Sequence, residues 1–245
     1  VIGLLLYIVF GMNFRKPGFF RYRNRKFLET FEEMADRKTK DLLFGTAEEE
    51  NIRPEYRDLC RLLKKDCGLT VTDNNEVEII TSGGRKLEAL VNDLIAAKHH
   101  IHFEYFYFLK DDGSRRIKNL LMQKAREGVK VRFIHENIAN ITIWPGYYNE
   151  MKEAGVEIVK FTNPNSFLLS KFNYRDHRKI VVIDGKVGYT GGMNIGEDYF
   201  FRWRDTHMRL TGNAVAALQY CFMNSWITSG GKIDGGFEEF FPQDR

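Results

Sequence analysis

The chain has 245 residues, of which 29% are charged and 43% hydrophobic, and this balance indicates a folded globular protein and excludes a disordered one. Its net charge of +4 permits an anionic membrane surface or a nucleic acid as partner without requiring either. The three cysteines, Cys60, Cys67 and Cys221, are odd in number and lack the spacing of zinc ligands. We therefore expect reduced, structural thiols in a protein that faces the cytosol.

The first segment, residues 1–14, is mostly apolar and is followed at once by basic residues, the first of which are Arg15 and Lys16. It is too short to span a bilayer, which takes about 20 residues. An apolar segment with basic residues after it is typical of the end of a transmembrane helix and its cytoplasmic flank. We therefore predict the end of a membrane helix at 1–14 and, because the chain does not start with Met, a longer natural protein. The alternative is a buried N-terminal core helix.

Residues 15–75 are predicted to form a basic juxtamembrane helical linker. Between 24 and 66, apolar residues recur at helical spacing with charged residues between them, beginning with Phe27 and Phe31. Pro54 marks the start of a second helix in this segment. We expect the linker to pack on the domain that follows it.

From residue 76 onward, predicted strands and helices alternate. The strands are expected at 77–81, 101–109, 129–134 and 156–161, and the helices at 86–98, 113–128, 147–154 and 214–226. The helix at 86–98 is expected to turn Leu87, Leu90, Leu94 and Ile95 inward. This alternation predicts an α/β domain at 76–245, with a mixed β-sheet flanked by helices.

The stretch 174–194, YRDHRKIVVIDGKVGYTGGMN, contains a predicted β-hairpin whose turn is Asp184-Gly185-Lys186. His177 and Lys179 are two residues apart, so their side chains share a face of an extended strand. An imidazole can attack phosphorus and form a covalent intermediate, and a lysine beside it supplies positive charge where phosphoryl oxygens gather charge. The alternative is a surface hairpin with an incidental His and Lys.

Three carboxylates are candidates for supporting such a site. Asp184 is an odd number of residues from His177 and lies at the turn, so we expect it to hold the hairpin through backbone hydrogen bonds. A carboxylate is still needed to fix the imidazole tautomer, and Asp205 is our candidate; a salt bridge to a neighbouring arginine is its alternative. Glu104, inside an apolar strand, is either a site carboxylate near the phosphate pocket or part of a core ion pair.

The hairpin resembles the signature of the phospholipase D superfamily, and the matching residues are His177, Lys179, Asp184, Gly191, Gly192 and Asn194. The resemblance extends along the chain from about residue 76 to the end. The segments IHFEYFYF, KAREGVKVRFI, EAGVEIVKF and WRDTHMRLTG are similar, in order and spacing, to those of bacterial cardiolipin synthases.

This resemblance implies a phosphatidyltransferase of the bacterial inner membrane, with its catalytic domain on the cytoplasmic side. It implies the joining of two phosphatidylglycerol molecules into cardiolipin and glycerol, with no metal, nucleotide or other cofactor and no nucleic-acid partner. His177 would be the nucleophile that carries the phosphatidyl group, and Asp184 and Asp205 would complete the catalytic set. Lys179, Gly192 and Asn194 would bind the phosphoryl oxygens.

Two features depart from the family pattern. Members carry two copies of the motif, and the second His acts as general acid, whereas this chain has one copy. We therefore expect a second phospholipase D-like half, either later in the same longer chain or from a homodimer mate. In addition, residues 135–140 replace the Tyr-Asp and Gly-Ser pattern of the family, so the sequence predicts the substrate less firmly than the chemistry.

Three other functions are alternatives to a cardiolipin synthase. Another phospholipase D-type phosphatidyltransferase or hydrolase shares the same motif. A single-motif homodimeric nuclease would need a basic groove with stacking aromatics, but Tyr105, Phe106 and Tyr107 are consecutive and cannot share one face of a strand. A catalytically inactive membrane scaffold would have no need of the intact motif.

Overall fold

A computed structural model describes residues 18–45, 52–136, 139–140, 145–161, 175–234 and 236–242. Within these ranges one mixed sheet is formed by β1 (Glu76–Ile80), β2 (His100–Tyr105), β3 (Lys130–Glu136), β4 (Glu157–Phe161), β5 (Lys179–Ile183), β6 (Val187–Gly191) and β7 (His207–Thr211). The strand order is β1-β7-β6-β5-β2-β3-β4. The pairs β2–β3 and β3–β4 are parallel, and the other neighbouring pairs are antiparallel. The predicted α/β fold with a mixed sheet and flanking helices is confirmed.

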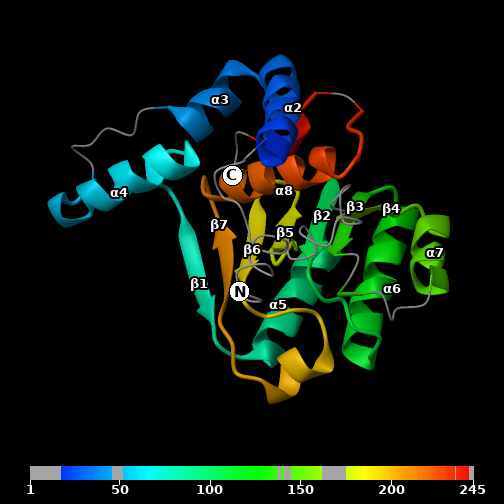
Figure 1. Cartoon of the computed structure of the whole chain (residues 1–245). Helices are drawn as coiled ribbons and strands as arrows, with labels where there is room; N and C mark the ends of the chain where they lie inside the picture. The colour runs from blue at the N-terminus through cyan, green and yellow to red at the C-terminus, as the bar shows by residue number, and fades with distance from the viewer. Residues whose placement is uncertain are drawn as a thin grey trace, which may run out of the picture.

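Helices cover both faces of this sheet (Figure 1). One face carries α5 (Gly83–Ala96), α6 (Asp112–Arg126) and α7 (Pro145–Glu153), whose apolar side chains pack with those of β2, β3 and β5. The other face carries α8 (Val215–Thr228), which is covered in turn by α2 (Gly18–Met34) and α3 (Arg37–Phe44). The α4 helix (Pro54–Cys67) extends away from the body (Figure 1).

The linker helices pack on the domain through aromatic contacts. The rings of Phe27 and Phe31 lie 4.9 Å and 5.1 Å from the ring of Tyr220 in α8. The predicted membrane segment 1–14 lies outside the described residues. Among the helices that the structure does describe, none has the length and apolar character needed to cross a bilayer.

Three details differ from the predicted elements. Strand β2 ends at Tyr105 instead of continuing to residue 109, and β7 was not predicted at all. The α5 helix turns Lys86 into the core and leaves Ile95 56% exposed, so the prediction that Ile95 points inward is wrong. Beyond the sheet, a short π-helix η3 (Asp198–Arg202) and a 3₁₀ turn η4 (Glu238–Phe240) complete the described elements.

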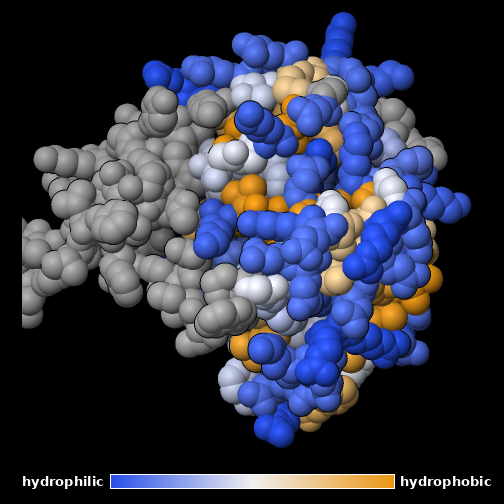
Figure 2. All heavy atoms as spheres, turned by 90° about the vertical axis from the view of Figure 1, so that its right-hand side faces the viewer, coloured by the Kyte–Doolittle hydropathy of each residue, from blue (hydrophilic) through white to orange (hydrophobic). Residues whose placement is uncertain are grey.

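The face formed by β4, α6 and α7 is mostly hydrophilic, with hydrophobic side chains in small separate groups (Figure 2). Scattered apolar side chains of this kind are normal on a soluble surface. The residues that can do chemistry lie elsewhere, at the ends of β2, β3 and β5.

Asp184 ties the β5–β6 turn to the start of β2. Its carboxylate accepts hydrogen bonds from the backbone N–H groups of Lys98, His99 and His100 at 2.8, 2.8 and 3.0 Å. Its own backbone has φ of +54°, which Asp and Asn tolerate better than most residues. Asp184 thus fixes where the hairpin sits against β2.

We expect Asp184→Ala to lower the free energy of unfolding by about 3 kcal/mol, because three N–H groups lose a charged acceptor and Ala resists this positive φ. Asp184→Asn keeps one acceptor and should lose about 1 kcal/mol. Urea denaturation would measure both variants. Asp58→Ala, which removes an exposed ion pair to Arg61, is the control and should cost under about 0.5 kcal/mol. A loss in Asp184→Ala no greater than in this control would contradict the structural role.

Candidate active site

His177 and Lys179 converge at the beginning of β5. Lys179 Nζ lies 3.1 Å from Nδ1 and 3.4 Å from Nε2 of His177, and it donates a hydrogen bond of 2.8 Å to the His177 carbonyl. The His177 side chain is exposed, whereas Lys179 is buried and pairs across the sheet with Tyr105. The structure therefore brings together the two residues that the motif predicted to share a face.

Burial and the neighbouring Lys179 ammonium lower the pKa of His177 below its ordinary value. Arg175 acts in the same direction, and the Asp176 carboxylate opposes them. Burial also lowers the pKa of Lys179 to about 8, against the charges of Asp176 and Asp205. At neutral pH the imidazole is therefore neutral, with a lone pair available for attack, while most Lys179 side chains remain charged.

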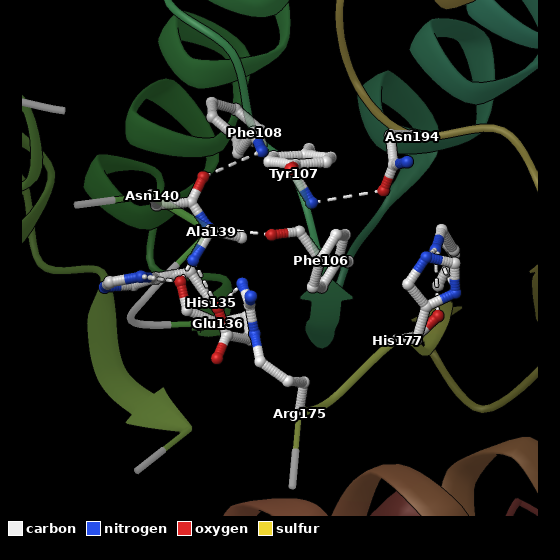
Figure 3. Close-up of polar contacts among 11 residues, drawn as sticks. Phe106, Tyr107, Phe108, His135, Glu136, Ala139, Asn140, Arg175, His177 and Asn194 are labelled. Atoms are coloured by element: carbon white, nitrogen blue, oxygen red, sulfur yellow. Dashed lines mark hydrogen bonds and ion pairs between the residues drawn. The ribbon is translucent and has the colours of Figure 1, made fainter. Parts of the chain in front are cut away.

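Asn194 is buried close to this pair. Its side-chain Oδ1 accepts a hydrogen bond of 3.1 Å from the backbone N–H of Tyr107, at the end of β2 (Figure 3). This bond orients the amide so that its NH₂ group lies away from Tyr107. An amide NH₂ held in this way is a donor suited to a phosphoryl oxygen.

Gly192 contributes space rather than a ligand. Its N–H donates to the Thr206 carbonyl at 2.8 Å, and its predicted contact with a phosphate stays a prediction. A Cβ atom on Gly192 would lie 2.1 Å from Oδ1 of Asp205. The preceding Gly191 has φ of +146°, which favours glycine, and a Cβ there would lie 2.6 Å from Cα of His207. The two glycines thus let β6 approach the segment that carries Asp205.

Asp205 lies beside the lysines of the site. Its Oδ1 accepts the N–H of Thr206 at 2.6 Å. Burial lowers the pKa of both Lys86 and Lys179, and the charge of Asp205 opposes this. Among the described contacts, none joins Asp205 to His177, and the carboxylate whose charge acts on His177 is Asp176. The alternative of an Asp205 salt bridge to a neighbouring arginine is absent from the same contacts, since Arg202 pairs with Asp198.

Glu104 lies on the opposite face of the sheet from Lys179. It pairs in register with Ile180, so its side chain is directed toward α8, where it is fully buried. Burial, and after it the charge of Asp176, raise the pKa of Glu104, and Arg178 and Ser225 oppose this. Asp184 likewise does not reach His177. Glu104 is therefore on the opposite face of the sheet from Lys179, and its role near a phosphate stays a prediction.

A network of hydrogen bonds fixes the loops after β2 and β3 (Figure 3). Asn140 donates 2.7 Å bonds to the carbonyls of Phe106 and Glu136 and accepts from the N–H of Phe108 at 3.1 Å. The Glu136 carboxylate accepts from the Ala139 N–H at 2.5 Å and pairs with Arg175 at 3.0 Å. Glu136 and Asn140, which lie where the sequence departs from the family pattern, thus hold the strand ends.

Phe106 forms a wall of the site between two basic side chains. Its ring centroid lies 4.5 Å from that of His177 and 5.1 Å from the Arg175 guanidinium carbon (Figure 3). Lys179 Nζ is 5.2 Å from the same centroid. An aromatic face attracts cations and excludes water, so Phe106 restricts how His177 and Lys179 are placed.

Sequence reasoning missed several of these residues. Lys86 gave a signal, because a lysine one turn before Leu90 falls on the apolar face of its helix. Asn140, Glu136 and Arg175 gave none, since their contacts depend on how the strand ends meet in space. Among the described residues, no three His, Cys, Asp or Glu side chains gather as metal ligands.

The sequence matches the protein family described as "Cardiolipin synthase, PLD-like domain" over residues 90–226. It is 35% identical to the major cardiolipin synthase ClsA of Bacillus subtilis (strain 168), over 92% of this chain and 48% of that protein. It is 36% identical to cardiolipin synthase 2 of Bacillus cereus, over 95% of this chain and 46% of that protein. The chain thus spans about half the length of the curated relatives it matches.

Among solved structures, the chain is similar to Nuc from Salmonella typhimurium, a phospholipase D family member. The TM-score is 0.52 at 13% identity, over 66% of this chain and all of that one. At so low an identity, the likeness shows a shared fold alone.

The electrostatic link between the two motif residues can be tested without any substrate. We expect Lys179→Met to raise the pKa of His177, because it removes a neighbouring positive charge. An NMR titration of the His177 ring would measure this. Lys130→Met, at the opposite end of the sheet, removes the same charge and should leave the titration unchanged. An unaltered His177 titration in Lys179→Met would show that the two groups are not coupled.

Proposed function

We propose, from the premise that this chain belongs to the family of cardiolipin synthase phospholipase D-like domains, that it is one catalytic half of a cardiolipin synthase. The reaction would join two phosphatidylglycerol molecules and release glycerol. The observation that carries the proposal is the neutral His177 imidazole with the Lys179 ammonium 3.1 Å from it. A nucleophile and a cation placed together in this way suit attack on a phosphodiester.

In the first step, a His177 ring nitrogen would attack phosphorus, forming an N–P bond and breaking the bond from phosphorus to the glycerol headgroup. Lys179 and Asn194 would stabilise the negative charge on the phosphoryl oxygens. The departing glycerol oxygen needs a proton, which a histidine of a second phospholipase D-like half would supply. This half would lie elsewhere in a longer chain or in a partner subunit.

In the second step, a hydroxyl of another phosphatidylglycerol would attack the phosphatidyl-histidine, breaking the N–P bond and restoring His177. The proton of that hydroxyl would pass to the base left by the first step, as microscopic reversibility requires. Water in place of the lipid hydroxyl would give phosphatidic acid instead. Acceptor choice thus separates a synthase from a phospholipase of the same family.

The proposed substrates are membrane lipids, and we place the enzyme at the bacterial cell membrane, with this domain on the cytoplasmic side. The apolar stretch 1–14 and the basic residues after it support this placement, because such a pattern favours a membrane helix with a cytoplasmic flank.

The nucleophile is tested in the full-length natural protein with phosphatidylglycerol vesicles. We expect His177→Ala to lower turnover by about 10⁴-fold or more, since the covalent route is lost. Mass spectrometry of acid-quenched enzyme should find a phosphatidyl adduct on wild type and none on the variant. His99→Ala, an exposed histidine at the other end of β2, is the control and should retain both. A His177→Ala enzyme that keeps the adduct would rule out this assignment.

We also propose that Asp205 serves the His177–Lys179 pair, orienting the imidazole once substrate is bound. Asp205→Asn should slow turnover by about 10²-fold with the fold intact. Because the Asp205 charge raises the pKa of Lys179, the variant should lose activity at a lower pH than wild type on the alkaline side. Asp198→Asn, which removes an exposed partner of Arg202, is the control for both effects. Unchanged turnover and an unchanged alkaline limit would leave Asp205 a purely structural residue.

A further inference from the structure

Lys86 is a buried lysine in the first turn of α5, and its position is costly in two ways. The residue is fully buried, where an ammonium group loses its hydration. It also lies at the N-terminal end of a helix, where the backbone dipole repels positive charge. A residue kept under such conditions needs compensating contacts, and those contacts lead to the active site.

Burial lowers the pKa of Lys86, and its side chain holds the backbone next to the Asn194 amide. Nζ donates a 2.8 Å hydrogen bond to the carbonyl of Met193 and a 3.1 Å bond to that of Asn194. It also lies 4.9 Å from the ring centroid of Tyr105, the residue that pairs with Lys179. From a helix that is distant in sequence, Lys86 therefore contacts both the segment after β6 and the last residue of β2.

Close packing of α5 makes this reach possible. A Cβ atom on Gly83 would lie 1.9 Å from the carbonyl oxygen of Tyr199, so glycine allows the helix to begin directly against η3. The lysine three residues later is thereby directed onto the segment 193–194. Asn194 is consequently fixed twice, through its carbonyl by Lys86 and through its side-chain Oδ1 by the Tyr107 N–H.

Two other buried lysines, which lie away from the site, each pair with a carboxylate. Lys118 Nζ pairs with Glu150 at 2.5 Å, and Lys124 Nζ pairs with Glu127 at 2.9 Å. Lys124 also donates to the carbonyl of Ile95 at 3.0 Å. Among the described residues, no salt bridge joins Lys86 to a carboxylate. The described hydrogen bonds of Lys86 go to the backbone carbonyls of Met193 and Asn194.

We propose that Lys86 is a positioning residue of phosphatidyl transfer, which fixes the backbone at 193–194 and so aims the Asn194 amide at the phosphoryl oxygens. The inference rests on the proposed function, because it assigns Lys86 a task in that reaction. Lys86 acts through Asn194, so removing either residue should remove the same contribution to the rate.

The test is a double-mutant cycle in the full-length natural protein on phosphatidylglycerol vesicles. Lys86→Met should lower kcat by about 10- to 100-fold with little change in KM, and Asn194→Ala should do the same. The double variant should be no slower than Asn194→Ala alone. Lys124→Met, which removes another buried lysine bonded to a carbonyl, should stay within about twofold of wild type. A double variant whose loss of kcat is the product of the two single losses would overturn the proposal. So would a loss of kcat in Lys124→Met equal to that in Lys86→Met.

Folding and function are separated by two additional measurements. If Lys86→Met unfolds at the assay temperature, Lys86→Gln replaces it in the same cycle, because its amide can still donate to one carbonyl. Orthovanadate binding is measured by calorimetry for each variant. Weaker binding in Lys86→Met than in Lys124→Met supports the positioning role even if wild type transfers no phosphatidyl group, an outcome that would defeat the proposed function alone. Equal vanadate affinity in these two variants would defeat the positioning role.

Discussion

Two buried lysines, Lys86 and Lys179, are the feature on which the rest of this site depends. Lys86 and Lys179 are both inside the protein, and burial together with their charges lowers the pKa of His207 to about 2. Asp205 is the carboxylate whose charge favours both ammonium groups. Burial lowers the pKa of both lysines against this charge. Burial and the charge of Lys179 in turn lower the pKa of His177.

The sheet provides the geometry for this charge arrangement through the way β2 ends. Its regular pairing ends at Tyr105: the side chains of Asn194 and Asn140 accept the N–H groups of Tyr107 and Phe108, and Phe108 forms an isolated bridge with Ile195. The freed segment places Phe106 against His177. The two asparagines thus hold the backbone that follows β2 through side-chain hydrogen bonds in place of regular sheet pairing.

Strand parity and the family motif were enough to predict the pair His177–Lys179 and the backbone-binding role of Asp184, because alternation along a strand is a local property. The match over residues 90–226 confirms the family that the motif predicted. The inward direction of Ile95 was predicted wrongly because the apolar face of the helix was assigned from hydrophobicity alone. The same assignment left out Lys86, although a lysine can be buried when its ammonium or amine donates hydrogen bonds to carbonyls. Strand β7 was missed because polar His207 and its neighbours gain their β structure from pairing with β6, which sequence spacing does not reveal.

Asp176 and Arg178, which precede His177 and Lys179 in the sequence, help to hold this part of the strand in place. Along 176–179 the side chains alternate, so that Asp176 and Arg178 are directed to the α8 side, where Arg178 donates to Ser225 Oγ at 2.8 Å. Glu104 lies there too, and its raised pKa, caused first by burial and then by Asp176, favours a proton on that carboxyl. One carboxylate and one guanidinium then balance each other on this face. His177 and Lys179 lie on the opposite face, so the two faces of one short strand carry different groups.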